Sequence, residues 1–223
     1  MVRWCGHSYF VVEALGHTIA LDPHDGDSLN LPRCGVQADL VLVTHDHYDH
    51  NAVEVASGPG AAVVRWREGA VNVGWAVVRG VRLSHDERGG ALFGHVVAYV
   101  VEVEGLRLAH LGDVGEPSSS AARVGKVDVV IVPAGDVTTV SQGEAIRWAE
   151  ALGARLVIPA HYWVPGSNVP LDPLDAFLAA WRGRVLRPGL SYIEVKGSDM
   201  PTEQTLVILE PPSRGPYNDS RLP

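Results

Sequence analysis

Apolar and polar positions form short runs along the first half of the chain, and this pattern predicts β-strands. The runs at 9–13 and 18–21 are joined by the segment ALGH, whose glycine favours the tight turn of a hairpin. Further strands are expected at 39–43, 61–65, 71–83 with breaks at Gly74 and Gly80, 93–104 and 106–111. The fold is therefore expected to begin with antiparallel β-structure.

The second half alternates strand and helix patterns. A continuous apolar run at 127–132 predicts a buried strand. Ser141 with Glu144 fits a capping box, and Gly153 supplies a helix stop. A strand at 156–158, a helix at 172–181 and late strands at 185, 192–195 and 205–209 follow. A β-rich half followed by alternating strands and helices predicts two sheets face to face with helices outside, an α/β (α+β) fold.

Composition is typical of one ordinary globular domain. The chain has 223 residues, of which 46% are hydrophobic and 20% are charged. We expect a single domain over 1–210 and a C-terminal tail over 211–223, poorly ordered or packed on a neighbour, because the tail is rich in proline and polar residues. The net charge of −8 without a long basic run argues against nucleic acid as a partner.

Cysteine content and the N-terminal segment bear on the compartment. Only Cys5 and Cys34 are present, and whether they pair does not follow from sequence, although reduced thiols are the simpler interpretation. The first residues lack an uninterrupted apolar core, and no run approaches the roughly 20 apolar residues of a membrane span. We expect a cytoplasmic protein without a membrane partner, with the oligomeric state left open and a homo-oligomer possible.

The segment THDHYDH at 44–50 concentrates three histidines and two aspartates. It follows the apolar run at 39–43 and precedes AVEVA, a helical segment that Asn51 could cap, so it is expected on a loop at the rim of a sheet. Imidazole and carboxylate are ligands of borderline and hard divalent metals, and the absence of cysteine excludes a thiolate site. A histidine-rich polar turn is the alternative.

The spacing HxHxDH, formed by His45, His47, Asp49 and His50, resembles the metal-binding motif of the metallo-β-lactamase fold hydrolases. The segments GHS at 6–8, LDP at 21–23, HLGD, PAGD and PAHYW are most similar to the branch that includes L-ascorbate-6-phosphate lactonase. The resemblance implies a four-layer αββα sandwich of two mixed sheets. It also implies two divalent metal ions, with zinc first and manganese or iron as alternatives.

Two metal sites need more ligands than one motif supplies. His85, Asp113 and His161 each end a short apolar run, as the resemblance requires. The resemblance assigns His45, His47 and His85 to the first metal, Asp49, His50 and His161 to the second, and Asp113 to both. His95 and His110 are rivals for the third position. Strand parity places His110 on the opposite face from Asp113, where a structural role is expected.

Several neighbouring residues have two interpretations each. Asp22 could accept the second N–H of a metal-bound imidazole and His7 could line the pocket, or both could make purely structural contacts. Tyr162 could donate to a developing oxyanion or belong to the core. Asp46 is expected to bond the loop backbone. Loops at 24–35, 86–94 and 164–172 would set specificity, with Arg33 and Arg88 as anion binders or, more simply, solvated surface residues.

These residues predict a dinuclear metal-dependent hydrolase that acts on a small-molecule ester, lactone or phosphoester. Two ions about 4 Å apart can activate a shared water, with Asp49 and Asp113 orienting it and one of them taking up its proton. The alternatives are a non-catalytic metal-binding regulatory or scaffold protein, a nuclease of the same fold and a redox di-iron enzyme. The last would need an electron donor for which the chain has no spare length.

Overall fold

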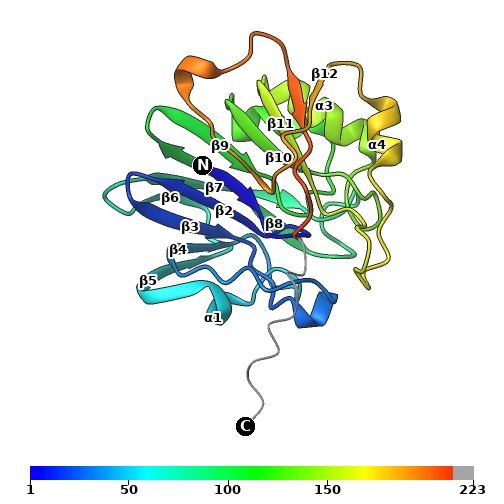
Figure 1. Cartoon of the computed structure of the whole chain (residues 1–223). Helices are drawn as coiled ribbons and strands as arrows, with labels where there is room; N and C mark the ends of the chain where they lie inside the picture. Colours follow the sequence, from blue (N-terminus) through cyan, green and yellow to red (C-terminus); the bar gives the residue numbers. More distant parts are fainter. Residues whose placement is uncertain (213–223) are drawn as a thin grey trace.

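Two mixed β-sheets pack face to face with short helices on their outer sides (Figure 1). The computed structural model describes residues 1–212. The first sheet has the order β13-β1-β2-β3-β4-β5. Its strands are β1 (Val2–Trp4), β2 (Phe10–Ala14), β3 (His17–Leu21), β4 (Ala38–Val43), β5 (Ser57–Arg65) and β13 (Tyr192–Ile193). The tail expected over 211–223 lies outside the described residues from 213 onward.

The second sheet has the order β12-β14-β11-β10-β9-β8-β7-β6. Its strands are β6 (Gly69–Asn72), β7 (Val77–Ser84), β8 (His95–Val103), β9 (Leu106–His110), β10 (Val129–Pro133), β11 (Leu156–Ala160), β12 (Arg184–Leu186) and β14 (Thr205–Val207). Strands β6 to β9 are antiparallel, whereas β9, β10, β11, β14 and β12 run parallel. The predicted mixed sheets are confirmed.

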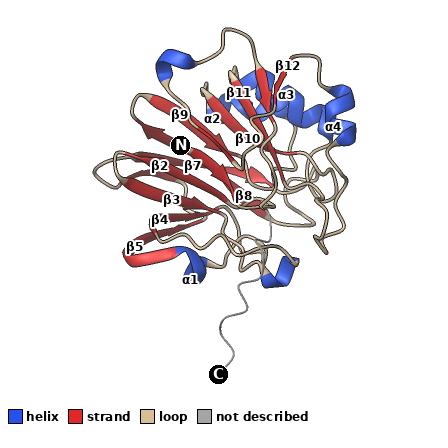
Figure 2. Cartoon of the chain, in the orientation of Figure 1, coloured by secondary structure: helices blue, strands red, loops and turns tan. Residues whose placement is uncertain are grey.

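Helices complete the outer layers (Figure 2). They are α1 (Val53–Ala56), α2 (Ala121–Val124), α3 (Gln142–Leu152) and α4 (Asp175–Ala180), with 3-10 turns at Asp27–Leu29, Ser118–Ser120 and Gly197–Asp199. Helix α1 contacts β4 and β5 of the first sheet, and α3 contacts β10 of the second, with α2 and α4 against α3. This is the four-layer αββα arrangement. Among residues 1–212, no helix is both long enough and apolar enough to cross a bilayer.

Strand alternation divides the apolar residues between two cores. Phe10 and Val12 of β2 point into the core between the sheets, where they pack with Trp4. Val11 points to the other face, where it packs with Tyr9 in a smaller core that includes the inner side of α1. Both faces of the inner strands β2, β3 and β4 are therefore covered, which explains why these strands are largely apolar on both sides, whereas the edge strand β5 is mostly exposed.

Helix α3 begins and ends where the sequence predicts. The Ser141 hydroxyl accepts a hydrogen bond from the Glu144 backbone N–H, and Gly153 adopts the left-handed conformation that closes the helix. The Glu144 carboxylate does not complete the capping box, because it accepts instead from the Ser118 backbone N–H. The side chain thereby ties the helix to the preceding loop.

Three local expectations are wrong. Asn51 does not cap α1, which begins after Ala52 without a side-chain cap, and the Asn51 amide donates to the Asp46 carboxylate. Asp46 is thus bonded to a side chain rather than to the loop backbone. Gly80 does not break a strand but lies inside β7, where a Cβ atom would meet the Arg67 carbonyl oxygen at 2.0 Å. Close approach of the backbone, not a turn, requires that glycine.

The two cysteines form a disulfide between Cys5 and Cys34, with a Cα–Cα distance of 5.4 Å. The preference for reduced thiols is therefore wrong. The pairing follows from the tertiary structure, because the turn after β1 lies against the loop that precedes β4 and both cysteines contact the smaller core. Separation along the chain carries no information about that proximity.

Candidate metal centre

Six turns at one edge of the sandwich carry the candidate side chains. Each turn follows a strand, namely β1, β3, β4, β7, β9 or β11. They supply His7, Asp22, His45, His47, Asp49, His50, His85, Asp113 and His161. Strand β3 pairs in parallel with β4, β9 with β10, and β10 with β11, so their carboxyl ends lie at the same edge. The topology thus gathers residues that are far apart in sequence.

The first histidine group consists of His45, His47 and His85. One nitrogen from each ring lies within 4.8 Å of the other two. His45 Nε2 is 3.0 Å from His47 Nδ1, and the rings of His45 and His85 meet edge to face. Burial lowers the pKa of His45 to about 3, with the neighbouring His50 acting in the same direction. This imidazole is therefore neutral and able to offer a lone pair at ordinary pH.

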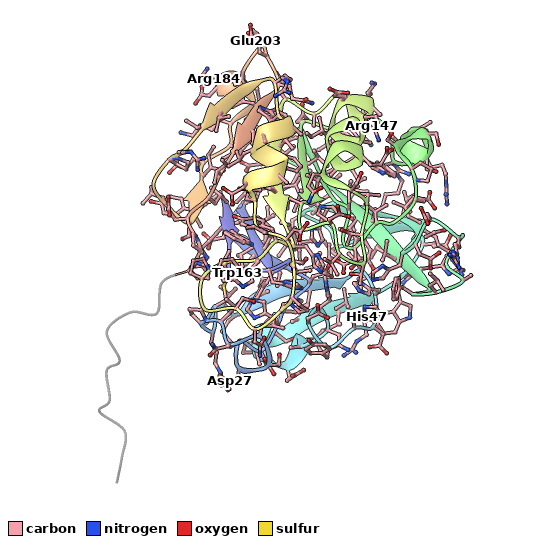
Figure 3. All side chains as sticks on the ribbon, turned by 90° about the vertical axis from the view of Figure 1, so that its right-hand side faces the viewer. Asp27, His47, Arg147, Trp163, Arg184 and Glu203 are labelled. Carbon is pink, nitrogen blue, oxygen red and sulfur yellow. A yellow bond between two sulfur atoms is a disulfide. The ribbon has the colours of Figure 1, made fainter. Side chains whose placement is uncertain are left out.

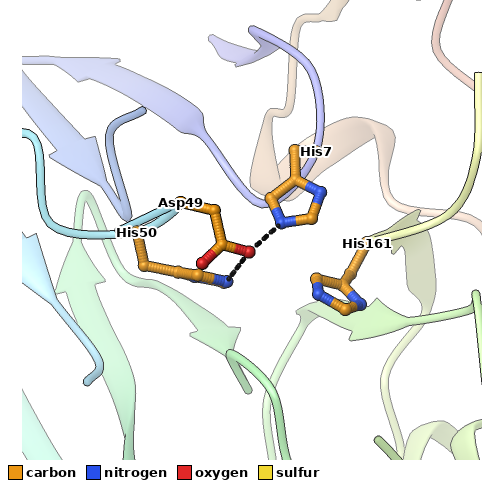
Figure 4. Close-up of side chains that lie close together, drawn as sticks. All are labelled: His7, Asp49, His50 and His161. Carbon is orange, nitrogen blue, oxygen red and sulfur yellow. Dashed lines mark hydrogen bonds and ion pairs between the residues drawn. The ribbon is translucent and has the colours of Figure 1, made fainter. Parts of the chain in front are cut away.

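The second histidine group consists of His7, Asp49, His50 and His161, again with candidate ligand atoms within 4.8 Å (Figure 4). Asp49 Oδ2 accepts a hydrogen bond from His7 Nε2 at 2.9 Å and lies 3.5 Å from His50 Nε2. Figure 4 shows the Asp49 carboxylate between the rings of His7 and His50. Burial lowers the pKa of His7 to about 4, with His161 acting in the same direction.

Asp113 lies between the two groups. Its Oδ2 atom is 3.6 Å from His85 Nε2 and 3.9 Å from His45 Nε2 on the first side. On the second side it is 3.4 Å from His50 Nε2 and 3.1 Å from His161 Nε2. Burial acts to raise the pKa of Asp113, but His161 and His50 hold it well below its usual range. The carboxylate is thus charged and contacts both groups.

Asp22 is a fully buried acceptor behind the second group. It accepts from the Thr44 backbone N–H and hydroxyl, each at 2.7 Å, from His50 Nδ1 at 3.0 Å and from His110 Nε2 at 2.8 Å. Burial acts to raise its pKa, but His110 and His50 lower it. Burial likewise acts to lower the pKa of His50, but Asp113 and Asp22 raise it well above the ordinary value. The Asp22 contact fixes His50 with Nε2 directed toward the centre.

The rival histidines lie elsewhere. His110 bonds Asp22 from the second sheet, so it links the two sheets behind the centre. His95 is exposed and bonds the Arg82 guanidinium at 3.2 Å. Neither belongs to the two groups.

Several buried polar atoms at the centre lack a hydrogen-bond partner among residues 1–212. They are Nε2 of His50, both ring nitrogens of His85, Nδ1 of His161 and Oδ1 of Asp113. An unsatisfied buried polar atom costs about 1–3 kcal/mol, so such a cluster is unfavourable without a bound group. Nitrogen and oxygen donors without thiolate fit zinc, manganese or iron. The residues present therefore fit divalent metal ions.

Backbone conformation at the centre is strained. His7, Asp22 and His161 have φ angles of 51°, 46° and 49°, in the left-handed region that non-glycine residues rarely adopt. Strain of this kind persists where surrounding structure fixes a functional side chain. Gly135 packs beneath one of them, because a Cβ atom there would lie 2.3 Å from the His161 carbonyl oxygen. These turns are held in place by tight packing.

A cavity of about 510 Å³ lies over both groups and is lined by His47, Asp49, His85, Asp113 and His161, among others. His47, labelled in Figure 3, is the half-exposed member of the first group. Tyr162 does not line this cavity. Its ring packs against Trp4, with centroids 5.1 Å apart, and burial raises its pKa. We therefore leave Tyr162 out of the site.

The sequence understates the importance of His7, for which it suggests only a contact with the pocket or a structural contact. The one sequence feature that points to His7 is the GHS segment at 6–8. Its meaning depends on β1, a three-residue strand that the hydrophobic pattern does not predict and that pairs with β2 and β13. Without that pairing, nothing in the sequence brings residue 7 beside residue 49.

Known proteins resemble the chain over most of its length. The profile of the beta-lactamase superfamily domain matches residues 1–161. The UPF0173 metal-dependent hydrolase of Geobacillus thermodenitrificans is 32% identical over 226 residues, covering 85% of this chain and 98% of the relative. UPF0173 protein PF0020 of Pyrococcus furiosus is 33% identical over 189 residues, covering 77% and 86%. A metallo-β-lactamase superfamily protein from Thermotoga maritima, solved by crystallography, has a TM-score of 0.78 at 31% identity, covering 95% of this chain and 98% of that one.

Proposed function

Because the chain belongs to the beta-lactamase superfamily and, within it, to the UPF0173 metal-dependent hydrolases, we propose that it is a dinuclear enzyme acting on a small ester, lactone or phosphoester. One observation carries the dinuclear part of the proposal. Two groups of candidate ligands face a single carboxylate, Asp113, and each group contains a buried imidazole nitrogen without a hydrogen-bond partner among residues 1–212, Nε2 of His85 in the first and Nε2 of His50 in the second. A single ion would leave one group unsatisfied.

In the proposed site, His45, His47 and His85 would hold one ion, and Asp49, His50 and His161 would hold the other. Asp113 lies between the two groups and would serve both ions. Zinc suits the first group, which consists of imidazoles alone. Manganese or iron would also accept the nitrogen and oxygen ligands of the second group. When bound, the ions supply an activated water and polarise the scissile group.

The chain's own residues orient the reaction. Asp49 is the carboxylate with an accessible edge, because its side chain is 13% exposed and lines the cavity. We assign it to orient the attacking water and take up its proton. The His7 N–H donates to Asp49, and Asp113, which lies between the two groups, would help to orient the same water. Asp22 fixes the His50 ring, so that its Nε2 atom is aimed inward before any ion binds.

The alternatives receive no support from the site. A scaffold protein would have no need for the full set of side chains, and the Geobacillus thermodenitrificans relative is a UPF0173 metal-dependent hydrolase. A nuclease would need a basic channel. None of the described residues that line the cavity is Lys or Arg. The lactonase-like branch suggested by sequence segments stays a prediction.

Elemental analysis of the full chain, purified without chelator, tests the proposal before a substrate is known. We expect about two equivalents of zinc, manganese or iron. The metal-loaded protein is then assayed against ester, lactone and phosphoester panels, with Asp49→Ala as the inactive variant. A metal-free protein that takes up no added metal would refute the ligand assignment. Two bound ions without hydrolysis of any panel would refute the reaction.

A further inference from the structure

The cavity over the two groups is apolar where it extends beyond the histidines. Its volume of about 510 Å³ falls in the range of roughly 300–1,000 Å³ that small-molecule sites occupy. The apolar lining residues are Tyr48, Phe93, Val137, Val169, Pro170 and Leu171. Metal-ligand candidates at one end and apolar side chains at the other give the cavity two chemically distinct halves.

The apolar half is open to solvent. Tyr48 is 64% exposed, Phe93 44% and Val137 42%, which is unusual for large apolar side chains gathered at one place. The Phe93 ring lies 5.5 Å from the His85 ring, so the apolar surface begins directly beside the candidate metal ligands. If a substrate places its reacting group at the candidate metal ligands, the substituent next to that group would therefore lie against this apolar surface.

Charge excludes one class of occupant. A second cavity shares Phe93 and Thr138 with the first and, like it, has no Lys or Arg among its described lining residues. It has four carboxylates, those of Asp86, Glu87, Asp136 and Glu144.

Only part of this negative charge is satisfied locally. Asp86 accepts four backbone N–H groups, and Glu144 pairs with Arg147. Glu87 and Asp136 form no ion pair among residues 1–212. An anionic substituent that reached into this second cavity would be repelled by these carboxylates, because no Lys or Arg among the described lining residues offsets their charge.

The two arginines considered as anion binders do not alter this balance. Arg33 forms an ion pair with Asp27. Neither Arg33 nor Arg88 lines either cavity. The phosphate group of a sugar phosphate would therefore find no arginine at the site.

We propose that the substrate is a neutral ester or lactone whose acyl chain is apolar, and that esters carrying an anionic group on the acyl chain are poor substrates. This inference rests on the proposed hydrolase function. In the reaction, the oxygen of water bonds to the acyl carbon and the ester C–O bond breaks. One water proton passes through Asp49 to the leaving alcohol oxygen, and the other is released as the product carboxylic acid ionises. The acyl chain lies across Phe93 and Val137.

Binding of alkyl hydroxamates to the zinc-loaded full chain tests the apolar half without requiring turnover. Hydroxamates chelate zinc, and the chain length can be varied from two to ten carbons. Calorimetry should show the dissociation constant falling roughly fourfold per methylene until the cavity is filled. Phe93→Ser and Val137→Ser should flatten this dependence. Val77→Ser is the matched control, because Val77 is 40% exposed at the opposite end of β7 from His85. A dissociation constant independent of chain length would overturn the inference.

Hydrolysis supplies the second arm. With one leaving group, 4-nitrophenol, kcat/KM for the hexanoate ester should exceed that for the adipate monoester, whose acyl chain ends in a carboxylate, at least about tenfold. Glu87→Lys with Asp136→Lys should narrow this difference by raising kcat/KM for the adipate monoester. Preference for the adipate monoester in the unaltered chain would overturn the inference while leaving the hydrolase function intact. Chain-length-dependent hydroxamate binding without hydrolysis of any ester or phosphate would refute the hydrolase function, and the apolar site would stand.

Discussion

The two histidine groups differ in how many separate turns of the chain supply their residues. The first takes His45 and His47 from one loop and His85 from the end of β7, and His47 is half-exposed. The second draws on the turns after β1, β4 and β11, is buried, and contains its own carboxylate, Asp49. A short motif nearly completes the first group. The second exists only when distant turns are held together, so its geometry depends on the whole fold.

The groups also differ in the support behind them. His50 of the second group is fixed by Asp22, which in turn bonds His110 on the opposite sheet. His85 of the first group has neither ring nitrogen bonded among residues 1–212. We therefore expect changes to the fold to weaken the second group more than the first, and changes to the shared carboxylate to weaken both.

Replacing the shared carboxylate should have the largest effect. Asp113→Ala removes the oxygen that lies within 3.9 Å of imidazole nitrogens in both groups. Affinity for both ions should fall roughly a hundredfold, and kcat/KM by about 10³-fold. Metal analysis after dialysis and steady-state kinetics measure these losses. Asp113→Asn, of equal size, should lose as much if charge is what matters. One ion retained at full affinity would show that Asp113 serves a single group.

Removing the Asp22 carboxylate, which lies behind the second group, should have the second-largest effect. Asp22→Ala leaves four buried donors without an acceptor, the N–H and hydroxyl of Thr44 and one ring N–H each of His50 and His110. The free energy of unfolding should fall by about 3–5 kcal/mol, and affinity for the second ion by 10- to 100-fold. Denaturant titration and metal competition measure the two effects. Among residues 1–212, the exposed carboxylate of Asp39 contacts only the Thr18 N–H and the His17 ring, so Asp39→Ala should cost under about 1 kcal/mol. Equal losses from both variants would contradict the special role of Asp22.

Removing the N–H behind Asp49 should affect one group only. His7→Ala frees the Asp49 carboxylate, so affinity for the second ion should fall about tenfold, with the first ion unchanged. Competition with a chelator should then show one tight and one weakened equivalent. His17→Ala is the control, because His17 is a partly exposed histidine stacked on Trp75, away from both groups. Loss of both ions in His7→Ala would mean that the groups are not separable.

Opening the disulfide should have the smallest effect on metal binding. Cys5 lies two residues before His7 and is joined to Cys34, 29 residues away. Reduction should lower the free energy of unfolding by about 3 kcal/mol and weaken the second ion a few-fold by loosening the turn that carries His7. Thermal unfolding and metal competition, each with and without reductant, measure this. The variant with Cys5→Ala and Cys34→Ala should not respond to reductant. An equal loss of affinity for the first ion on reduction would contradict the view that the second group depends more on the rest of the fold.

What the sequence predicts well is what depends on neighbours in the chain. Alternating apolar residues predict most strands, and Ser141 with Gly153 bounds α3 correctly. The strand ends at His85, Asp113 and His161 could be picked out because glycine or proline stands near each. The structure brings all three beside the HxHxDH motif, although their roles as ligands stay a prediction.

What the sequence does not predict depends on contacts across the fold. The position of His7 follows from β1 pairing with β13, nearly the whole chain away. The Cys5–Cys34 bond follows from a loop packed against the turn after β1. Gly80 is indistinguishable from a strand breaker until the Arg67 carbonyl is seen beside it. In each case the deciding neighbour lies outside any local window.

The positions of the two groups along the chain also set the order in which their side chains are synthesised. His85, the last member of the first group, is synthesised 76 residues before His161, the last of the second. At about 5–20 residues per second, translation separates the two by roughly 4–15 seconds. Every imidazole of the first group therefore exists while the second still lacks a ligand. The direction of translation thus gives the imidazole-only group the first opportunity to meet a metal ion in the cell.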